Sequence, residues 1–288
     1  MTPREQHLAT RSSAGLFDFS FMGLYEFPEG KQLNELQTRQ LQNLAPGQIA
    51  YTLLLNEAGA VLIDATVWRL DDGRFWLFTG KRGKYPARDR SGEYAILALQ
   101  GPASGALLAR LIGRDAVLGL KYFHFTRSKD LIVARLGYSG ELGYELLVPA
   151  ARAPELTGKL IEQGVLACTF DAADTLRIES GYVLFDRELD GHANPRELGL
   201  ERFAGSSRDF PLTKKLVGLE FTDKTDSKAP LARVTSECFS HTFGKRIALG
   251  FAPPDAGDAV RLAGGRAARI VPLPFYDPER QRPRGAPL

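Results

Sequence analysis

Cysteine is scarce in this sequence. Its two copies, Cys168 and Cys238, lie far apart and form no CxxC motif. A disulfide framework or a cysteine-based zinc site is therefore not expected, and a reducing compartment is the default. The four histidines are scattered without the spacing of metal ligands, and no phosphate-binding glycine loop is present. These absences leave no motif for a metal centre or a P-loop enzyme.

Long apolar stretches are also missing. No segment approaches the roughly 18 consecutive apolar residues of a membrane helix, and residues 1–15 lack the apolar core of a secretory signal. The net charge is only +3, with a pI near 8.8 and no basic run. We therefore expect a cytoplasmic protein with no membrane or nucleic-acid partner. The mildly basic balance would suit an anionic small ligand, although an ordinary solvated surface is the simpler explanation.

What is present is the composition of an ordinary globular protein. Of the 288 residues, 44% are hydrophobic and 25% are charged, which is usual for folded domains. A chain of this length commonly divides into two or three domains. An apolar period in Lys31–Leu44 predicts one amphipathic helix, and the segments 50–55 and 60–70 predict a strand pair joined by a short turn.

The stretch from Leu131 to Pro195 carries the strongest pattern. An apolar strand is followed by GYSGELGYE (137–145), whose three glycines indicate a turn with positive φ or a closely approached backbone. DAADTLRIESG (171–181) then predicts a short helix with Asp171 as N-cap and Gly181 just past its end. LFDRELD (184–190) and NPRELGL (194–200) complete the series.

This series resembles the folate-dependent aminomethyltransferase family, to which the T-protein of the glycine cleavage system belongs. The family pattern is roughly GYTGE-G-E, D-LR-E-G, LY-ELD and TP-E-GL, in the same order. AGLFDFSFMG (14–23) and the strand pair around Asp64 extend the similarity, which covers residues 5–275 with two internal shortenings. The resemblance implies an α+β fold in which three domains form a cloverleaf around a central folate hole. It implies antiparallel sheets with packed helices and a small C-terminal β-barrel or jelly-roll-like domain. The implied domains are 1–22 with 95–205, then 23–94, then 206–288 with a disordered tail.

The resemblance also implies a set of site residues. Asp64 interrupts an apolar strand, where a carboxylate is costly unless it is exposed or hydrogen-bonded, and it falls on the family's catalytic aspartate. Its neighbour Ile63 replaces a second acid. The implied cofactor, tetrahydrofolate, would be bound by five residues: Glu179 through the pterin N–H groups, Tyr51 and Tyr138 by packing, Met22 against the ring, and Arg208 through the carboxylate tail. On residue type alone, Glu179 would be an exposed helix residue and Met22 core filler. Arg177 is expected to make an internal ion pair.

The function implied is a tetrahydrofolate-dependent transferase or demethylase that moves a methyl or methylene group from a small amine, ether or thioether. Two alternatives stay open: the glycine cleavage aminomethyltransferase proper, with a carrier protein or complex subunit as partner, and a non-catalytic folate-binding regulatory or assembly module. The short segment 81–94 has five cationic residues against two acids. We expect it to widen the donor side of the cleft and to favour an anionic donor or a polyglutamate tail. The alternative is an ordinary basic surface.

Overall fold

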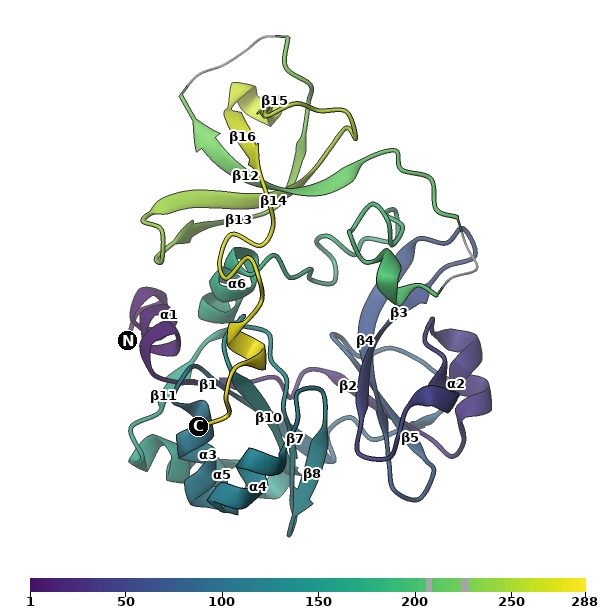
Figure 1. The fold of residues 1–288 in the computed structure, drawn as a ribbon, viewed down its shortest axis with the longest axis vertical. Coiled ribbons are helices and arrows are strands. Elements are labelled where there is room, and N and C mark those ends of the chain that lie inside the picture. Colours follow the sequence, from purple (N-terminus) through teal and green to yellow (C-terminus); the bar gives the residue numbers. More distant parts are fainter. Residues whose placement is uncertain (206–208, 224–227) are drawn as a thin grey trace.

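A computed structural model describes residues 1–205, 209–223 and 228–288. Three sheets form three lobes arranged around a common centre (Figure 1). Nearly all strand pairs are antiparallel, and helices pack mainly on one lobe, so the predicted α+β fold with antiparallel sheets is confirmed. In the described part of the chain, no helix is long and apolar enough to cross a membrane.

The first lobe is built on a six-stranded sheet in the order β11-β1-β7-β10-β9-β8. Its β1–β11 pair is parallel and its other pairs are antiparallel. The strands are β1 (Gly15–Asp18), β7 (Tyr94–Gln100), β8 (Phe125–Ser128), β9 (Leu131–Ala134), β10 (Gly143–Pro149) and β11 (Leu166–Cys168). The helices are α1 (Pro3–Ser12), α3 (Ser104–Ile112), α4 (Arg114–Gly119), η2 (Ala150–Arg152), α5 (Ala153–Glu162) and α6 (Phe170–Glu179).

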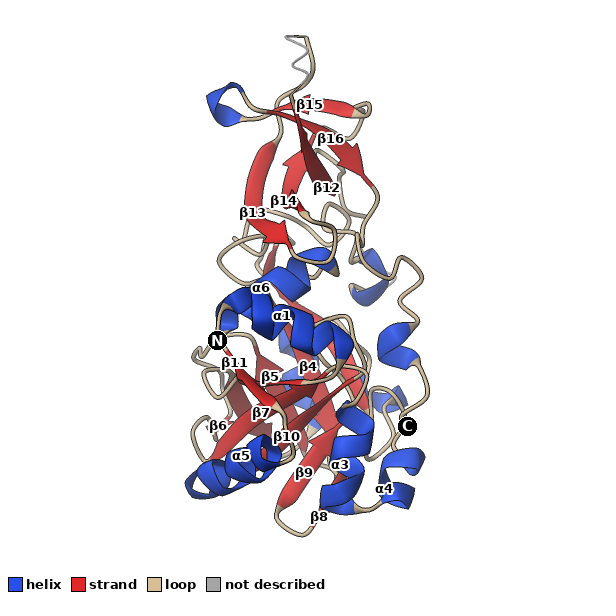
Figure 2. Cartoon of the chain, turned by 90° about the vertical axis from the view of Figure 1, so that its left-hand side faces the viewer, coloured by secondary structure: helices blue, strands red, loops and turns tan. Residues whose placement is uncertain are grey.

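The two faces of this sheet bury different partners because side chains alternate along each strand. One face packs under α3, α4 and α5 in a cluster that includes Leu99, Leu108 and Leu146. The other face packs against α6 and the second sheet, in a cluster that includes Phe17, Trp68 and Leu176. Figure 2 shows α1 and α6 at the upper end of this lobe, next to the third lobe, and α3, α4 and α5 further down. The second face therefore faces the centre of the molecule.

The second lobe is a five-stranded antiparallel sheet in the order β3-β4-β5-β2-β6. It contains β2 (Gly23–Phe27), α2 (Gly30–Leu36), η1 (Leu41–Asn43), β3 (Ile49–Leu55), β4 (Val61–Arg69), β5 (Phe75–Thr79) and β6 (Arg88–Asp89). The single helix predicted for Lys31–Leu44 is wrong, since α2 ends at Leu36. Thr38 turns to β3 instead, where its N–H donates to the Leu53 carbonyl at 3.1 Å.

The third lobe follows η3 (Glu201–Phe203) and is a five-stranded antiparallel sheet in the order β13-β14-β12-β16-β15. Its elements are β12 (Lys215–Thr222), β13 (Arg233–Ser240), β14 (Lys245–Ala252), β15 (Ala259–Arg261), η4 (Ala263–Gly265) and β16 (Ala267–Val271). From there the chain returns along the first lobe and forms η5 (Arg282–Arg284) (Figure 1). The tail, for which composition favoured disorder, is held against that lobe by hydrogen bonds to Glu141 and Arg135.

Candidate functional site

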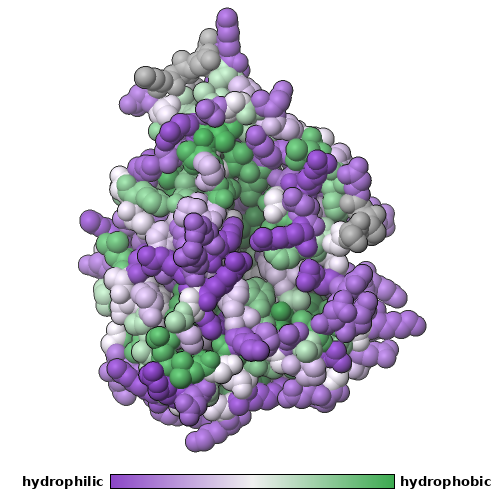
Figure 3. Space-filling view, viewed as in Figure 1, coloured by the Kyte–Doolittle hydropathy of each residue, from purple (hydrophilic) through white to green (hydrophobic). Residues whose placement is uncertain are grey.

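The three lobes enclose one large cavity of about 790 Å³. Its walls come from β3 and β4, from the Gly137–Tyr138 turn and β10, from the chain after α6, from η3, and from the C-terminal tail. In the space-filling view the hollow at the centre has hydrophobic residues inside and hydrophilic ones around it (Figure 3). A ligand-sized space at the junction of lobes is where a binding site is expected.

Asp64 and Tyr51 lie on the neighbouring strands β4 and β3, and both line this cavity. The Tyr51 hydroxyl donates a hydrogen bond to Asp64 Oδ2 at 2.9 Å. Strand alternation puts Asp64 on the cavity face of β4, whereas Ile63 packs into the lobe core with Leu54 and Val67. The second acid that Ile63 replaces would therefore point away from the cavity. Burial raises the pKa of Asp64 to about 6, and the Tyr51 bond opposes that rise.

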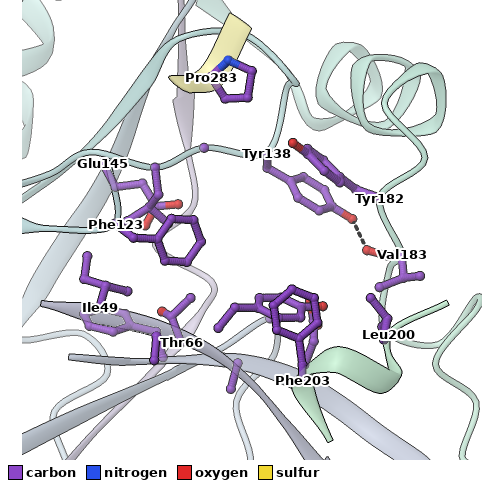
Figure 4. A pocket seen from close by; sticks show the side chains of 18 of the residues that line it. Ile49, Thr66, Phe123, Tyr138, Glu145, Tyr182, Val183, Leu200, Phe203 and Pro283 are labelled. Carbon is purple, nitrogen blue, oxygen red and sulfur yellow. Dashed lines mark hydrogen bonds between the residues drawn. The ribbon is translucent and has the colours of Figure 1, made fainter. Parts of the chain in front are cut away.

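The glycine-rich turn holds Tyr138 in the cavity wall. A Cβ on Gly137 would lie 1.9 Å from Gln100 Oε1, and one on Gly143 would lie 2.4 Å from the same side chain. Glycine is required there because the turn wraps tightly around Gln100. Tyr138 donates its hydroxyl proton to the Val183 carbonyl at 2.6 Å and stacks with Tyr182, with ring centroids 5.9 Å apart (Figure 4).

Glu145, which ends the same motif, is the residue that sequence reasoning missed. Glu145 lines the cavity and is only 5% exposed. No described residue donates a hydrogen bond to its carboxylate or forms an ion pair with it. The residues paired with Glu145 on the flanking strands β7 and β9 are Ala98 and Ala134, whose side chains have no polar group. Burial raises its pKa to about 7. A carboxylate left without a partner in a cavity is poised to accept hydrogen bonds from a ligand. The available signal was a glutamate interrupting the apolar strand 143–149.

Comparisons with known proteins give the family. Residues 2–208 match the GCVT N-terminal domain family, and residues 214–277 match the glycine cleavage T-protein C-terminal barrel domain family. The chain belongs to the glycine cleavage T-protein family. Residues 278–288 lie beyond both matched segments.

Relatives and a solved structure agree with this assignment. The aminomethyltransferase of Rubrobacter xylanophilus is 35% identical, over 98% of this chain and 88% of its own. That of Synechococcus elongatus is 33% identical, over 94% and 87%. The crystal structure of glycine cleavage system aminomethyltransferase T from Bartonella henselae superposes with a TM-score of 0.78 at 27% identity, over 96% of this chain and 90% of that one. As the motifs predicted, the chain is a tetrahydrofolate-dependent transferase of this family.

One feature of this structure makes the cavity suitable for tetrahydrofolate. The pterin ring carries adjacent N–H and amino donors, and the Glu145 carboxylate is the buried acceptor that lacks donors. Figure 4 shows Glu145 and Phe123 on one side of the cavity and Tyr138 and Tyr182 on the other. Among the described residues, no group of three or more His, Cys, Asp or Glu side chains could hold a metal ion.

Of the predicted cofactor residues, Tyr51, Tyr138 and Met22 line the cavity together with Asp64. Met22 is half-buried and packs against the aromatic core of the first two lobes. Arg208 lies outside the described residues. Glu179 does not line the cavity.

The Glu179 carboxylate is instead fully enclosed between α1, α6 and the turn after β13. Arg11 Nη2 donates to Oε2 at 2.7 Å, Ser240 donates to Oε1 at 2.5 Å and Thr242 donates to Oε2 at 2.9 Å. His7 Nε2 lies 3.3 Å from Oε1. Burial raises the pKa of Glu179, but the bonds from His7 and Ser240 and the charge of Arg11 outweigh it and hold the pKa at about 2. Because these partners already satisfy its oxygens, Glu179 has a structural environment rather than a ligand-facing one.

Arg177 makes the internal ion pairs expected of it. Its guanidinium is fully buried and donates to Asp174 at 2.7 Å, to Glu188 at 2.8 Å and to Ser236 at 2.7 Å. These bonds tie α6 to the chain after it and to β13. The DTLRIESG motif therefore serves the junction between the first and third lobes.

The basic segment 81–94 contributes no residue to the cavity lining. The residue before it, Gly80, does line the cavity. Arg90 pairs with Glu93 and with Glu26 at 2.8 Å, and Lys81 pairs with Asp186. The cations of this segment are therefore largely neutralised locally. The positive charge in the cavity wall comes from other residues.

Proposed function

We propose that this chain transfers the aminomethyl carbon of a carrier-bound thioether donor to two nitrogens of tetrahydrofolate, while the amine leaves as ammonia and the carrier sulfur as a thiol. This is the reaction of the glycine cleavage aminomethyltransferase proper. The family and its named relatives favour this alternative over the broader demethylase hypothesis. The observation that carries the proposal is the presence of two acids in one cavity, the half-buried Asp64 and the buried Glu145. Tetrahydrofolate, when bound, supplies the amine nitrogens that accept the one-carbon unit.

Glu145 orients the ligand in this proposal. Its carboxylate accepts hydrogen bonds from the ring N–H and amino groups, the role that sequence reasoning gave to Glu179. Charge-assisted hydrogen bonds of this kind contribute about 1.5–3 kcal/mol each. Tyr138 and Tyr182 offer aromatic surface to the ring system from the opposite wall (Figure 4).

Asp64 handles the proton in this proposal. With a pKa near 6 it can change protonation state close to neutral pH, which is what proton transfer requires. Tyr51 holds Oδ2, so that Oδ1 is the atom left to accept and return a proton. Asp64 is half-buried, and the cavity wall around it limits the access of water to Oδ1.

The test is turnover of an aminomethyl donor on a lipoylated carrier, with Asp64→Asn against the matched exposed control Asp115→Asn. We expect Asp64→Asn to lower kcat by about 10²–10⁴-fold while the Kd for tetrahydrofolate stays the same. Asp115 lies exposed on α4, so its variant should retain full turnover. Full activity of Asp64→Asn would refute the role of Asp64. Turnover of methylated amines, ethers or thioethers, with none of the carrier-bound donor, would refute the proposed reaction.

A further inference from the structure

Arg11, in the last turn of α1, uses all five of its guanidinium N–H groups. Nε and Nη2 donate to Glu179 Oε2 at 3.2 Å and 2.7 Å. Nη1 donates to the Ser139 carbonyl at 2.8 Å and to Glu141 Oε1 at 3.1 Å. A further bond from Nη2 reaches the Leu176 carbonyl at 3.4 Å. Because the five donors of a guanidinium lie in one rigid plane, this side chain locks α6 to the glycine-rich turn.

The turn that Arg11 contacts is the one that carries Tyr138 into the cavity wall. The Ser139 carbonyl accepts one bond from Arg11 and another from the Ser180 hydroxyl at 2.9 Å. The Ser139 hydroxyl donates to Gln100 Oε1, also at 2.9 Å. The turn is therefore held by Gln100 on one side and by Arg11 on the other. Since Tyr138 directly precedes Ser139 and lines the cavity, a shift of the Ser139 carbonyl would move the Tyr138 ring.

The same guanidinium holds the start of the C-terminal tail, residues 276–288. It lies 3.8 Å from the centre of the Tyr276 ring. The Tyr276 hydroxyl donates to Glu141 at 2.7 Å, and its N–H donates to the Glu179 carbonyl at 2.8 Å. Figure 1 shows the yellow tail passing α6 before it runs down the first lobe. The tail thus begins on the cluster around Arg11.

Beyond Tyr276 the tail has a backbone conformation that its own residues do not favour. Asp277 and Arg280 have positive φ angles of 50° and 53°, a region that residues with a side chain rarely adopt. Such a conformation persists only where the surrounding contacts impose it. The far end is held by Arg135, which donates a hydrogen bond to the Gly285 carbonyl. The tail therefore depends on anchors from the first lobe at both ends.

Between these anchors the tail forms part of the cavity wall. Arg280, Pro283 and Arg284 all line the cavity. Figure 4 shows Pro283 of the tail and Tyr138 of the turn at the border of the same space. Arg11 is not among the described residues that line it. One arginine outside the cavity therefore contacts both segments that supply these walls.

We propose that Arg11 is a positioning residue for the tetrahydrofolate site: by joining the Ser139 carbonyl to the Tyr276 ring, it holds the Tyr138 wall and the C-terminal tail in register. The inference rests on the proposed function, because it takes the cofactor to lie against the Tyr138 wall. A lysine could keep the charge beside Glu179. It could not make the same bonds, since an ammonium has three donors on one nitrogen and no planar face to stack on Tyr276.

The experiment compares Arg11→Lys with Thr242→Val by isothermal titration calorimetry with tetrahydrofolate. Both variants weaken the enclosure of Glu179, because Thr242 donates to Glu179 Oε2 at 2.9 Å. Only Arg11→Lys also removes the bond to Ser139 and the stacking on Tyr276. We expect the Kd to rise by ~10-fold in Arg11→Lys, as for the loss of one charge-assisted bond to the ligand, and to stay within ~3-fold in Thr242→Val. Partial unfolding alone would lower the binding stoichiometry and leave the Kd unchanged, so this readout separates positioning from stability.

A second readout needs no ligand. Trypsin cleaves after Arg280 and Arg284 once the tail leaves the lobe, and mass spectrometry identifies the fragments. We expect cleavage at these two sites to be ~10-fold faster in Arg11→Lys than in the unmodified chain, and unchanged in Thr242→Val.

Tyr276→Leu tests the same contact from its other side. It leaves all five hydrogen bonds of Arg11 in place, so it remains informative even where Arg11→Lys folds poorly. We expect it to raise the Kd and to speed cleavage of the tail. Added to Arg11→Lys, it should raise the Kd by less than ~3-fold more, because both changes act through one contact. Fully additive effects would contradict this coupling.

A Kd for Arg11→Lys within ~3-fold of the unmodified chain, or an equal rise in Thr242→Val, would overturn the inference. Tail cleavage at the unmodified rate in Arg11→Lys would overturn it as well. Any of these results, with intact binding by the unmodified chain, would leave the proposed function standing. Absence of tetrahydrofolate binding by the unmodified chain would instead refute the proposed function, and the cleavage rates would still decide whether Arg11 holds the tail.

Discussion

Replacing Glu145 by glutamine should stabilise the ligand-free protein at neutral pH and weaken its affinity for tetrahydrofolate. The carboxyl has an ordinary pKa of 4.5, and burial raises it to about 7 in the folded chain. Below pH 4.5 it is protonated in both states and has no effect. Between the two values the folded state keeps a proton that the unfolded state has released, so stability falls as pH rises. The shift corresponds to about 3 kcal/mol, at about 1.4 kcal/mol per pKa unit.

The assay is urea unfolding of the unmodified chain and of Glu145→Gln at a series of pH values from about 4 to about 8, each at the same salt. Between pH ~4.5 and pH ~8 the unmodified chain should lose about 3 kcal/mol of unfolding free energy relative to the variant. The Kd for tetrahydrofolate should rise at least ~10-fold in the variant, since one charge-assisted bond contributes about 1.5–3 kcal/mol. A difference that does not change with pH, or unchanged folate affinity, would refute the reasoning.

Three further predictions concern the rest of the site. Tyr51→Phe removes a bond that lowers the pKa of Asp64, so the rising limb of kcat with pH should move up by about 1–2 units; a limb that stays in place would contradict this. Glu179→Gln should cost about 3 kcal/mol at pH 7, because a pKa lowered from 4.5 to about 2 adds stability above pH 4.5 that is lost as pH falls toward 2. A urea midpoint equal to that of the unmodified chain at pH 7 would rule this out. Gly137→Ala should destabilise by about 1–3 kcal/mol by displacing the turn, whereas Gly158→Ala should not destabilise; equal melting temperatures for the two would show that the turn tolerates a Cβ.

Much of the fold could be predicted because local pattern and family resemblance agreed. The strand pair around Asp64, the strands beside the glycine-rich turn and the helix that contains Asp171 all appear in the structure. The N-cap of that helix is Thr169, so the prediction of Asp171 as N-cap is wrong. The helix expected for Lys31–Leu44 failed because an apolar period cannot reveal that Thr38 bonds to β3. The domain boundaries stay a prediction.

The motif residues Asp64, Tyr51 and Tyr138 all line the cavity, and their roles stay a prediction. The order of the C-terminal tail, residues 276–288, was missed because its proline- and arginine-rich composition favours disorder. Only tertiary contacts with Glu141 and Arg135 hold it in place. Arg280 and Arg284 line the cavity, although no local sequence signal places them there. Their position depends on where the chain returns from the third lobe.

Glu145 and Glu179 show why a motif alone cannot assign a ligand-binding acid. Both sit in family motifs and both are almost completely buried. Glu179 accepts bonds from Arg11, Ser240 and Thr242, and its pKa is lowered to about 2. Glu145 accepts none from the described residues, and its pKa is raised to about 7. Burying a carboxylate without partners costs free energy that no contact from the described residues offsets. This difference from Glu179 supports the proposal that a ligand supplies donors to Glu145.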